Sequence, residues 1–200
     1  MIELSTAIKC PNVDYFLCTF KIFQYFLQKP EILRKFLPEE LISKDISRFF
    51  KKIYFLKDMS DEEKLKLVDD IRENVNNYVV KPQKEGGGNN YFGDDIIKLL
   101  PPDNDLTQLH HELQSSIIME RINPPQHEGL VLRENKLSSV KCVSEFSVFG
   151  AIISDDNSIL LNKSFGFLVR TKAENVNEGG VATGFSAIDL PYLTDGREII

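Results

Sequence analysis

The sequence has no tryptophan, only three cysteines and no long apolar run. Cys10, Cys18 and Cys142 are odd in number and form no C-x-x-C pair, so nothing indicates a disulfide framework or a zinc site. We expect three buried or half-buried thiols in a reducing, cytoplasmic setting. The N-terminus, MIE, is not basic and no apolar segment of spanning length follows it. We therefore expect neither a signal peptide nor a membrane partner.

Basic residues are also in deficit. The chain has 24 Lys and Arg against 30 Asp and Glu, a formal net charge of −6. That balance argues against nucleic acid or an anionic membrane surface as the main partner. Apolar residues make up 42% of the 200 positions and include 14 Phe, which is enough for the core of one domain, or of one and a part.

The stretch YVVKPQKEGGGNNYFG, residues 78–93, is the most distinctive in the chain. Its first three residues are β-formers and predict a short buried strand, and residues 94–100 predict a helix with acids in its first turn. Between them, three consecutive glycines allow bare backbone N–H groups to approach an anion, and two asparagines add amide donors. A polyphosphate cradle and a flexible surface loop both fit this composition. Neither a Walker G-K-[ST] nor a G-x-G-x-x-G pattern is present.

The first third of the chain is predicted to be mostly helical, after a weak strand pattern over residues 2–8. Apolar residues fall at helical spacing in 12–27, in 38–53 and in 60–74, and Ser60 with Glu63 forms a capping box. We expect residues 1–77 to be a mostly helical segment that continues from a larger domain, and residues 78–200 to form a separate portion that begins with the glycine-rich stretch. One predicted apolar stripe contains Phe16, Phe20, Phe23 and Leu27.

The last part is predicted to be β. Residues 116–120 form a strand of buried type that stops at Asn-Pro-Pro, and residues 130–132, 140–149 and 158–170 alternate as antiparallel strands. Asp155, Asp156 and Asn157 form a predicted hairpin turn. The fold class is therefore α+β, with helices first and an antiparallel sheet after them.

Several polar residues have both a functional and an ordinary interpretation. Arg170 and Lys172 are two apart on a strand, so they share a face that suits two anionic groups, or simply faces water. Glu145 lies on a strand face and Lys21 lies off the apolar stripe; solvated side chains explain both. The strand end at residues 119–122 exposes backbone groups that fit a purine edge, as many strand ends do. The loop at residues 178–184 is rich in small residues and suits a mobile lid.

Seven short motifs occur in a fixed order. They are AIKCP (7–11), VVKPQKEGGGNN (79–90), IIMERI (117–122), CVSEFSVFG (142–150), NKSFGFLVRTKA (162–173), EGGVATG (178–184) and the segment 189–192. Together they resemble the C-terminal part of eukaryotic glutathione synthetases, which are ATP-grasp ligases. The resemblance implies an ATP-grasp fold with residues 78–200 as its nucleotide-binding portion. It also implies ATP and Mg²⁺ as cofactors, γ-glutamylcysteine and glycine as substrates, and a homodimer. It also implies phosphorylation of the γ-glutamylcysteine carboxylate and attack by the glycine amine on the acyl phosphate, a reaction that needs positioning and charge neutralisation rather than a protein nucleophile.

The resemblance also implies roles for individual residues. The implied ATP-contacting residues are Lys21, Lys81, Glu85, Gly86, Gly87, Gly88, Asn89, Asn90, Phe92, Met119, Glu120, Arg121, Ile122, Glu145, Lys172 and Glu178. Glu85 is the implied Mg²⁺ ligand. Arg170, Val181 and Ala182 are the implied peptide-substrate contacts, and Lys81 and Arg170 are the implied catalytic residues.

Two departures from the family pattern bear on function. Phe92 stands where the family has a nucleotide-contacting Tyr, with Tyr91 before it; a lost hydroxyl costs at most one hydrogen bond. The family's earlier half, with further Mg²⁺ ligands and an arginine near the place of Thr6, has no counterpart here. The chain is thus either a fragment of a longer ligase or a truncated relative. A non-catalytic ATP-binding or interaction module, and a ligase with a changed acceptor amine, remain open, as does activity of the 200 residues alone.

Overall fold

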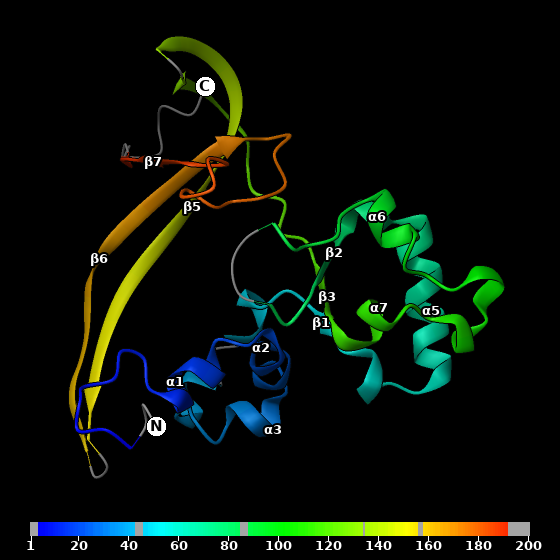
Figure 1. Cartoon of the computed structure of the whole chain (residues 1–200), viewed down its shortest axis with the longest axis horizontal. Coiled ribbons are helices and arrows are strands. Elements are labelled where there is room, and N and C mark those ends of the chain that lie inside the picture. The colour runs from blue at the N-terminus through cyan, green and yellow to red at the C-terminus, as the bar shows by residue number, and fades with distance from the viewer. Residues whose placement is uncertain (1–3, 43–45, 85–87, 134, 156–157, 192–200) are drawn as a thin grey trace. The chain divides into compact units, whose positions relative to one another are not determined.

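The computed structural model of the chain describes residues 4–42, 46–84, 88–133, 135–155 and 158–191 (Figure 1). The chain forms two compact units, Met1–Ile122 and Asn123–Ile200. The change of character predicted at residue 78 falls inside the first unit, where the strand that begins at Tyr78 pairs within a sheet. The division of the chain at that residue stays a prediction.

A three-stranded antiparallel sheet forms the centre of the first unit. Its order is β1 (Ile53–Tyr54), β3 (Ile117–Glu120), β2 (Tyr78–Lys81). Val79 pairs with Met119 and Val80 with Ile118, so the two predicted strands of this unit exist and are neighbours. Because side chains alternate between the faces of a strand, this register decides which residues meet on each side.

One face of the sheet packs against three helices, α5 (Asp61–Glu73), α6 (Asp94–Ile97) and α7 (His111–Ser115). Helix α5 starts at the predicted capping box, with both reciprocal Ser60 and Glu63 bonds present. Helix α6 is shorter than the predicted helix over residues 94–100. The core on this face consists of Leu56, Leu67, Val68, Ile71, Tyr78, Val80, Ile96, Leu99, Leu100, Leu109, Leu113 and Ile118.

The other face packs against α2 (Lys21–Leu27) through Tyr25, Ile53 and Ile117. The single long helix predicted over residues 12–27 is wrong. It divides into α1 (Val13–Cys18) and α2, because Phe20 has extended backbone angles, φ −63° and ψ 135°. Residues before and after this break no longer share one face, so Phe16 and Phe23 are exposed. The strand predicted over residues 2–8 is also wrong for residues 4–8, which form turns and bends.

The remaining elements of the first unit are short. They are α3 (Pro30–Leu33), α4 (Glu39–Ile42) and the 3-10 helices Ile46–Phe49, Leu56–Asp58, Val75–Asn77, Pro102–Asn104 and Leu106–Gln108. Cys10 and Cys18 are exposed, contrary to the expectation of buried thiols, whereas Cys142 in the second unit is buried. Among the described residues, no helix is both long and apolar enough to cross a lipid bilayer.

The second unit is an antiparallel sheet in the order β4 (His127–Arg133), β5 (Lys136–Ser154), β6 (Ile159–Ala173), β7 (Ala187–Asp189). β5 and β6 are longer than predicted and pair along most of their length, with register shifts between Phe149 and Gly150 and between Ile153 and Ser154 (Figure 1). Asp156 and Asn157 of the predicted hairpin turn lie outside the described residues; the Asp155 N–H donates to the Ser158 carbonyl at 3.0 Å.

Candidate functional site

The strand pair β5–β6 brings three of the predicted site residues to one face. Glu145 and Arg170 are directly opposed, and Arg170 Nη2 donates to Glu145 Oε1 at 2.5 Å. Lys172 lies two residues further along β6 and therefore projects to the same side, as the sequence spacing predicts. The three side chains carry two positive charges and one negative charge, so together they have a net charge of +1.

Both cations of this cluster also hold the loop that follows β6. Lys172 Nζ donates to the carbonyl oxygens of Asn177 at 2.8 Å and Glu178 at 3.2 Å, and Arg170 Nη1 donates to that of Gly179 at 3.4 Å. The start of the predicted lid is thus hydrogen-bonded to Arg170 and Lys172. The family resemblance assigns these same two cations to the peptide substrate and to ATP. A ligand that recruits these cations must compete with the loop carbonyls for their N–H groups.

The charge state of Glu145 follows from its surroundings. Partial burial raises the pKa of this carboxyl, but the hydrogen bond and the charge of Arg170, a hydrogen bond from Ser147 and the charge of Lys172 lower it by more. The net result is a pKa below the ordinary value, so Glu145 is an anion at neutral pH. It suits charge pairing and positioning better than proton transfer.

The opposite face of the same strands carries a polar clamp that sequence reasoning missed. The hydroxyls of Ser144 and Thr171 are 2.7 Å apart, and Thr171 Oγ1 donates to Asp189 Oδ2 at 2.8 Å. Thr171 is buried, and these bonds fix β7 beside the strand that carries Arg170 and Lys172. The local signal is weak because Thr171 looks like an ordinary strand residue until its long-range partners are known.

The predicted lid is a compact turn. Gly184 N–H donates to the Val181 carbonyl at 2.9 Å, Phe185 N–H donates to the Gly180 carbonyl at 2.9 Å, and Gly184 has a φ of +79°. Val181 is half-buried and Ala182 is exposed, so Ala182 is the more accessible of the two implied substrate contacts in this loop.

In the first unit, the two ends of the glycine-rich segment are each held. At its start, Lys21 Nζ donates to the Lys84 carbonyl at 3.2 Å, and the Ile22 N–H donates to Gln83 Oε1 at 3.3 Å. At its end, Val80 and Tyr91 exchange two backbone hydrogen bonds of 3.1 and 2.9 Å. Sequence reasoning missed Gln83, whose role depends on a helix distant in sequence.

Lys81 lies on the α2 side of the sheet. It pairs with Ile117, and Ile117 packs against α2. Lys21 begins that helix, so the structure brings both predicted phosphate-binding lysines of this unit to one side. The implied site residues Glu85, Gly86 and Gly87 lie outside the described residues. Gly88 is described and has a φ of +82°, a conformation that favours glycine; Asn89 is exposed and Asn90 half-buried.

In the strand end predicted to bind adenine, two backbone N–H groups already donate hydrogen bonds within the protein. The Glu120 N–H donates to the Lys52 carbonyl at 3.0 Å, and the Arg121 N–H donates to the Asn77 carbonyl at 2.7 Å. The Glu120 side chain accepts from the Tyr54 hydroxyl at 3.2 Å, on the α5 side of the sheet. Met119 packs on the α2 side and Ile122 is 71% exposed, which makes Ile122 the most accessible part of this segment.

Phe92 has a defined neighbour. The guanidinium carbon of Arg121 lies 5.4 Å from the centre of the Phe92 ring, a cation–π arrangement. The residue that departs from the family pattern therefore contacts one of the implied nucleotide-binding residues. A tyrosine at this position has the same ring face, so the departure changes a hydroxyl and keeps the stacking surface.

The described residues offer cations and amides suited to the phosphates of ATP rather than a metal site built from protein ligands alone. They contain no group of three His, Cys, Asp or Glu that is arranged to hold a metal ion. Mg²⁺ bound together with a nucleotide needs only one or two protein carboxylates, since phosphate oxygens and water supply the rest. Glu85, the implied ligand, is outside the described part, so the fit concerns the cations and amides alone.

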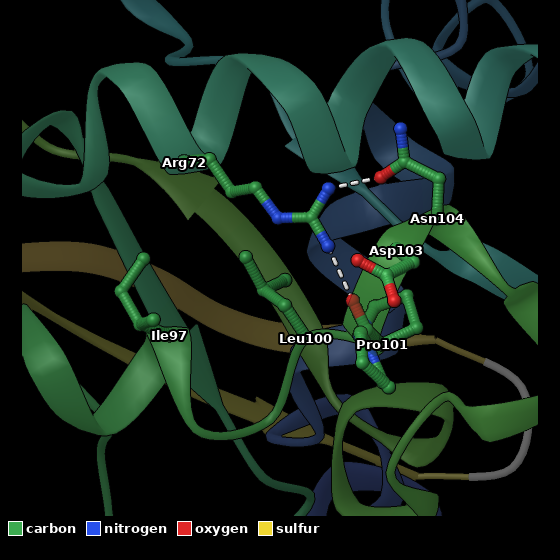
Figure 2. Close-up of a pocket in the computed structure, with 7 residues that line it drawn as sticks. Arg72, Ile97, Leu100, Pro101, Asp103 and Asn104 are labelled. Atoms are coloured by element: carbon green, nitrogen blue, oxygen red, sulfur yellow. Dashed lines mark hydrogen bonds between the residues drawn. The ribbon is translucent and has the colours of Figure 1, made fainter.

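A surface hollow of about 640 Å³ lies elsewhere in the first unit (Figure 2). In it, Arg72 of α5 donates to Asn104 and to the Pro101 carbonyl, which clamps the turn after α6 to the helix. The hollow is open, and none of the predicted site residues line it. We therefore assign it a structural role. Its lining consists of Arg72, Ile97, Leu100, Pro101, Pro102, Asp103 and Asn104.

Comparisons with known proteins agree on one family. Residues 4–193 match the model described as eukaryotic glutathione synthase, ATP binding domain. Curated glutathione synthetases are 35% identical over 195 residues in Dictyostelium discoideum and 33% identical over 195 residues in Homo sapiens, and the chloroplastic glutathione synthetase of Solanum lycopersicum is 34% identical over 197 residues. Each match covers 96% of this chain but only 40%, 40% and 34% of the respective relative.

A solved structure supports the fold. It is a glutathione synthetase-like effector from Globodera pallida in its apo form, with a TM-score of 0.64 and 21% sequence identity. The match covers 96% of this chain and 38% of that one. The mixed helices and antiparallel sheets agree with the ATP-grasp fold class expected from the sequence.

Proposed function

The chain belongs to the eukaryotic glutathione synthase family through its ATP-binding domain, and from this premise we propose that it binds ATP with Mg²⁺ and serves the ATP-dependent ligation of glycine to γ-glutamylcysteine. The observation that carries the proposal is the cluster of Glu145, Arg170 and Lys172 on one face of β5–β6. It offers fixed positive charge beside a small-residue loop, as the transfer of a phosphoryl group to a carboxylate requires.

Each cation has a distinct part in the proposal. Lys172 pairs with nucleotide phosphate, and Arg170, with its planar fork of donors, holds the peptide carboxylate and offsets negative charge as the acyl phosphate forms. Glu145 keeps Arg170 in place through their hydrogen bond and contacts the nucleotide. Glu178, Val181 and Ala182 belong to the loop that closes over the nucleotide and the peptide substrate in this proposal.

In the first unit, the family resemblance assigns Lys21 and Lys81, which both lie on the α2 side of the sheet, to the phosphates. Gln83 holds the start of the glycine-rich segment against α2, and Asn89 and Asn90 follow it with amide donors. The strand end at residues 119–122, together with Phe92 and Arg121, forms the surface for adenine, with Ile122 the exposed backbone position. Gly86, Gly87 and Gly88 supply backbone N–H groups to the phosphates in this scheme.

Mg²⁺, when bound with the nucleotide through Glu85, would neutralise phosphate charge and orient the transferred group. The γ-glutamylcysteine carboxylate accepts the phosphoryl group, and the glycine amine then displaces phosphate to form the amide, leaving ADP. The chain's own contribution is to bind, orient and neutralise. Its residues supply no nucleophile in this scheme.

A second function is supported by Phe92, which stands where the family pattern has a nucleotide-contacting tyrosine. The chain spans about two fifths of the relatives it matches. A non-catalytic ATP-binding or interaction module fits the changed residue at position 92. Such a module binds Mg²⁺–ATP without turnover. Homodimer formation and a cytoplasmic location stay predictions for either function.

Phosphate release and melting temperature together distinguish the ligase from the non-catalytic module. Phosphate release is measured with ATP, Mg²⁺, γ-glutamylcysteine and glycine, using the complete gene product, with the double variant Lys81→Ala, Glu85→Ala as the control. Release that needs both substrates and falls at least about a hundredfold in the control supports the ligase. A Mg²⁺–ATP-dependent rise in melting temperature without release supports the module, and absence of both overturns the proposal.

A further inference from the structure

The outer part of the β5–β6 pair has an unusual surface. We call residues 146–154 of β5 and 159–168 of β6 the distal ribbon. Lys163 is its single charged residue. Its large apolar side chains that are more than half exposed are Phe146, Val148, Phe149, Ile153, Ile159, Leu160, Phe165 and Phe167. Contiguous apolar surface of this kind marks an interaction site in a soluble protein.

The apolar side chains occupy both faces of the distal ribbon. Val148 is directly opposed to Phe167, and the rings of Phe146 and Phe167 stack with centroids 5.3 Å apart. Phe149 and Ile153 are at odd positions of β5 and project to the other face. An antiparallel sheet at a protein surface commonly keeps one polar face towards water. The distal ribbon lacks such a face along most of its length.

Its edges are open as well. β4 pairs with β5 only between residues 136 and 142, and β7 pairs with β6 only between residues 169 and 171. Within the described strands of this unit, no third strand flanks the distal ribbon. An isolated two-stranded ribbon is marginally stable in water, and unpaired edges are templates for pairing.

The coverage of the matched relatives bears on what the distal ribbon contacts. The match takes in 96% of this chain but 40% of the Dictyostelium relative and 38% of the Globodera chain, so about three fifths of a family member's polypeptide has no counterpart here. We propose that the distal ribbon is the docking surface for that remaining polypeptide. A second copy of this chain fits less well, because one two-fold contact covers a single face or edge, whereas the exposed apolar side chains lie on both faces.

This inference does not depend on the proposed activity, since a module without turnover would dock in the same way. The test co-expresses the 200-residue chain with a tagged form of the remainder, meaning the part of the Dictyostelium enzyme outside its match to this chain. Two variant chains are compared with the wild type. One carries Val148→Glu and Phe167→Glu in the distal ribbon, and the other carries Leu130→Glu and Leu132→Glu on β4. All four residues are more than half exposed, so none of them supports the core.

We expect the wild type and the β4 variant to co-purify with the remainder as a 1:1 complex, and the ribbon variant to be recovered at least tenfold less. A second measurement needs no variant: hydrogen exchange of residues 146–153 and 159–168 should slow at least tenfold in the complex. Three results overturn the proposal. They are no co-purification of the wild type, equal loss in both variants, and self-association of the chain that the ribbon substitutions abolish.

Discussion

Arg170 and Glu145 are directly opposed on β6 and β5, and Nη2 of the arginine donates to Oε1 of the glutamate at 2.5 Å. The pair lies where two motifs that are separate in the sequence meet. This ion pair orients the guanidinium that we assign to the peptide substrate, and Lys172 lies two residues further along β6 on the same face.

The first prediction concerns the pH dependence of this ion pair. The pKa of Glu145 is lowered in the folded chain, so its stabilising effect is present above the unfolded pKa of about 4.3 and is lost as the pH falls through the folded value. Since 60% of the Glu145 side chain is exposed, Glu145→Gln should cost only about 0.5–1 kcal/mol in free energy of unfolding at pH 7. In urea titrations this cost should shrink as the pH falls through the lowered pKa of Glu145. Glu174→Gln, at an exposed carboxylate after β6, is the control, and a pH-independent cost contradicts the assignment.

The second prediction concerns the loop after β6. Lys172→Met removes the ammonium that donates to the Asn177 and Glu178 carbonyls. Amide hydrogen exchange of residues 176–180 should then accelerate about tenfold, equivalent to about 1.4 kcal/mol of local opening. Lys172→Arg keeps a donor at this position and should show a smaller change. Equal exchange in all three proteins means that the lysine does not hold the loop.

The third prediction concerns the core of the first unit. Tyr78 is buried, and its hydroxyl donates to Asp70 Oδ2; burial first and this bond second raise its pKa. Tyr78→Phe should lower the free energy of unfolding by about 1–2 kcal/mol, because the bond is made to a charged acceptor. Hydrogen bonds from Tyr78 and Asn74 lower the pKa of Asp70, so the loss should shrink as the pH falls through that lowered pKa and the carboxyl becomes protonated. Tyr15→Phe, at a half-exposed ring, should change stability by less than about 0.5 kcal/mol.

The fourth prediction tests where the core lies. Leu113 is fully buried among α5, α6 and the sheet, and Leu113→Ala should cost about 2–5 kcal/mol in urea unfolding. Leu130→Ala removes an equal side chain that is 72% exposed on β4 and should cost less than about 0.5 kcal/mol. Equal costs would show that the packing described for the first unit is wrong.

The sequence predicted correctly those helices and strands that depend on residues close to one another in the chain. The α5 cap at Ser60 and the strands at Tyr78 and Ile117 formed where predicted, because capping chemistry and β-branched runs act over a few residues. The aromatic stripe through Phe16 and Phe23 failed because the extended backbone at Phe20 breaks the helix. Ile53, predicted in a helix, is in a strand because it pairs with Met119, far away in sequence.

The candidate site was also predictable only in part, because some of its contacts join residues that are far apart in the sequence. A two-residue spacing was enough to place Arg170 and Lys172 on one face. Their partners were not predictable, since Glu145, the loop carbonyls and the Thr171–Asp189 bond are fixed by strand register. Gln83 was missed for a similar reason, because its partner is the backbone of α2.

Calorimetric titration of Mg²⁺–ATP into the 200-residue chain tests the central claim, that its lysines bind nucleotide phosphate. The account predicts saturable binding of one nucleotide per chain, weakened at least tenfold by Lys81→Ala and by Lys172→Ala, and unchanged by Lys66→Ala at an exposed ion pair on α5. Absence of binding at millimolar nucleotide, or equal affinity in all four proteins, would contradict it.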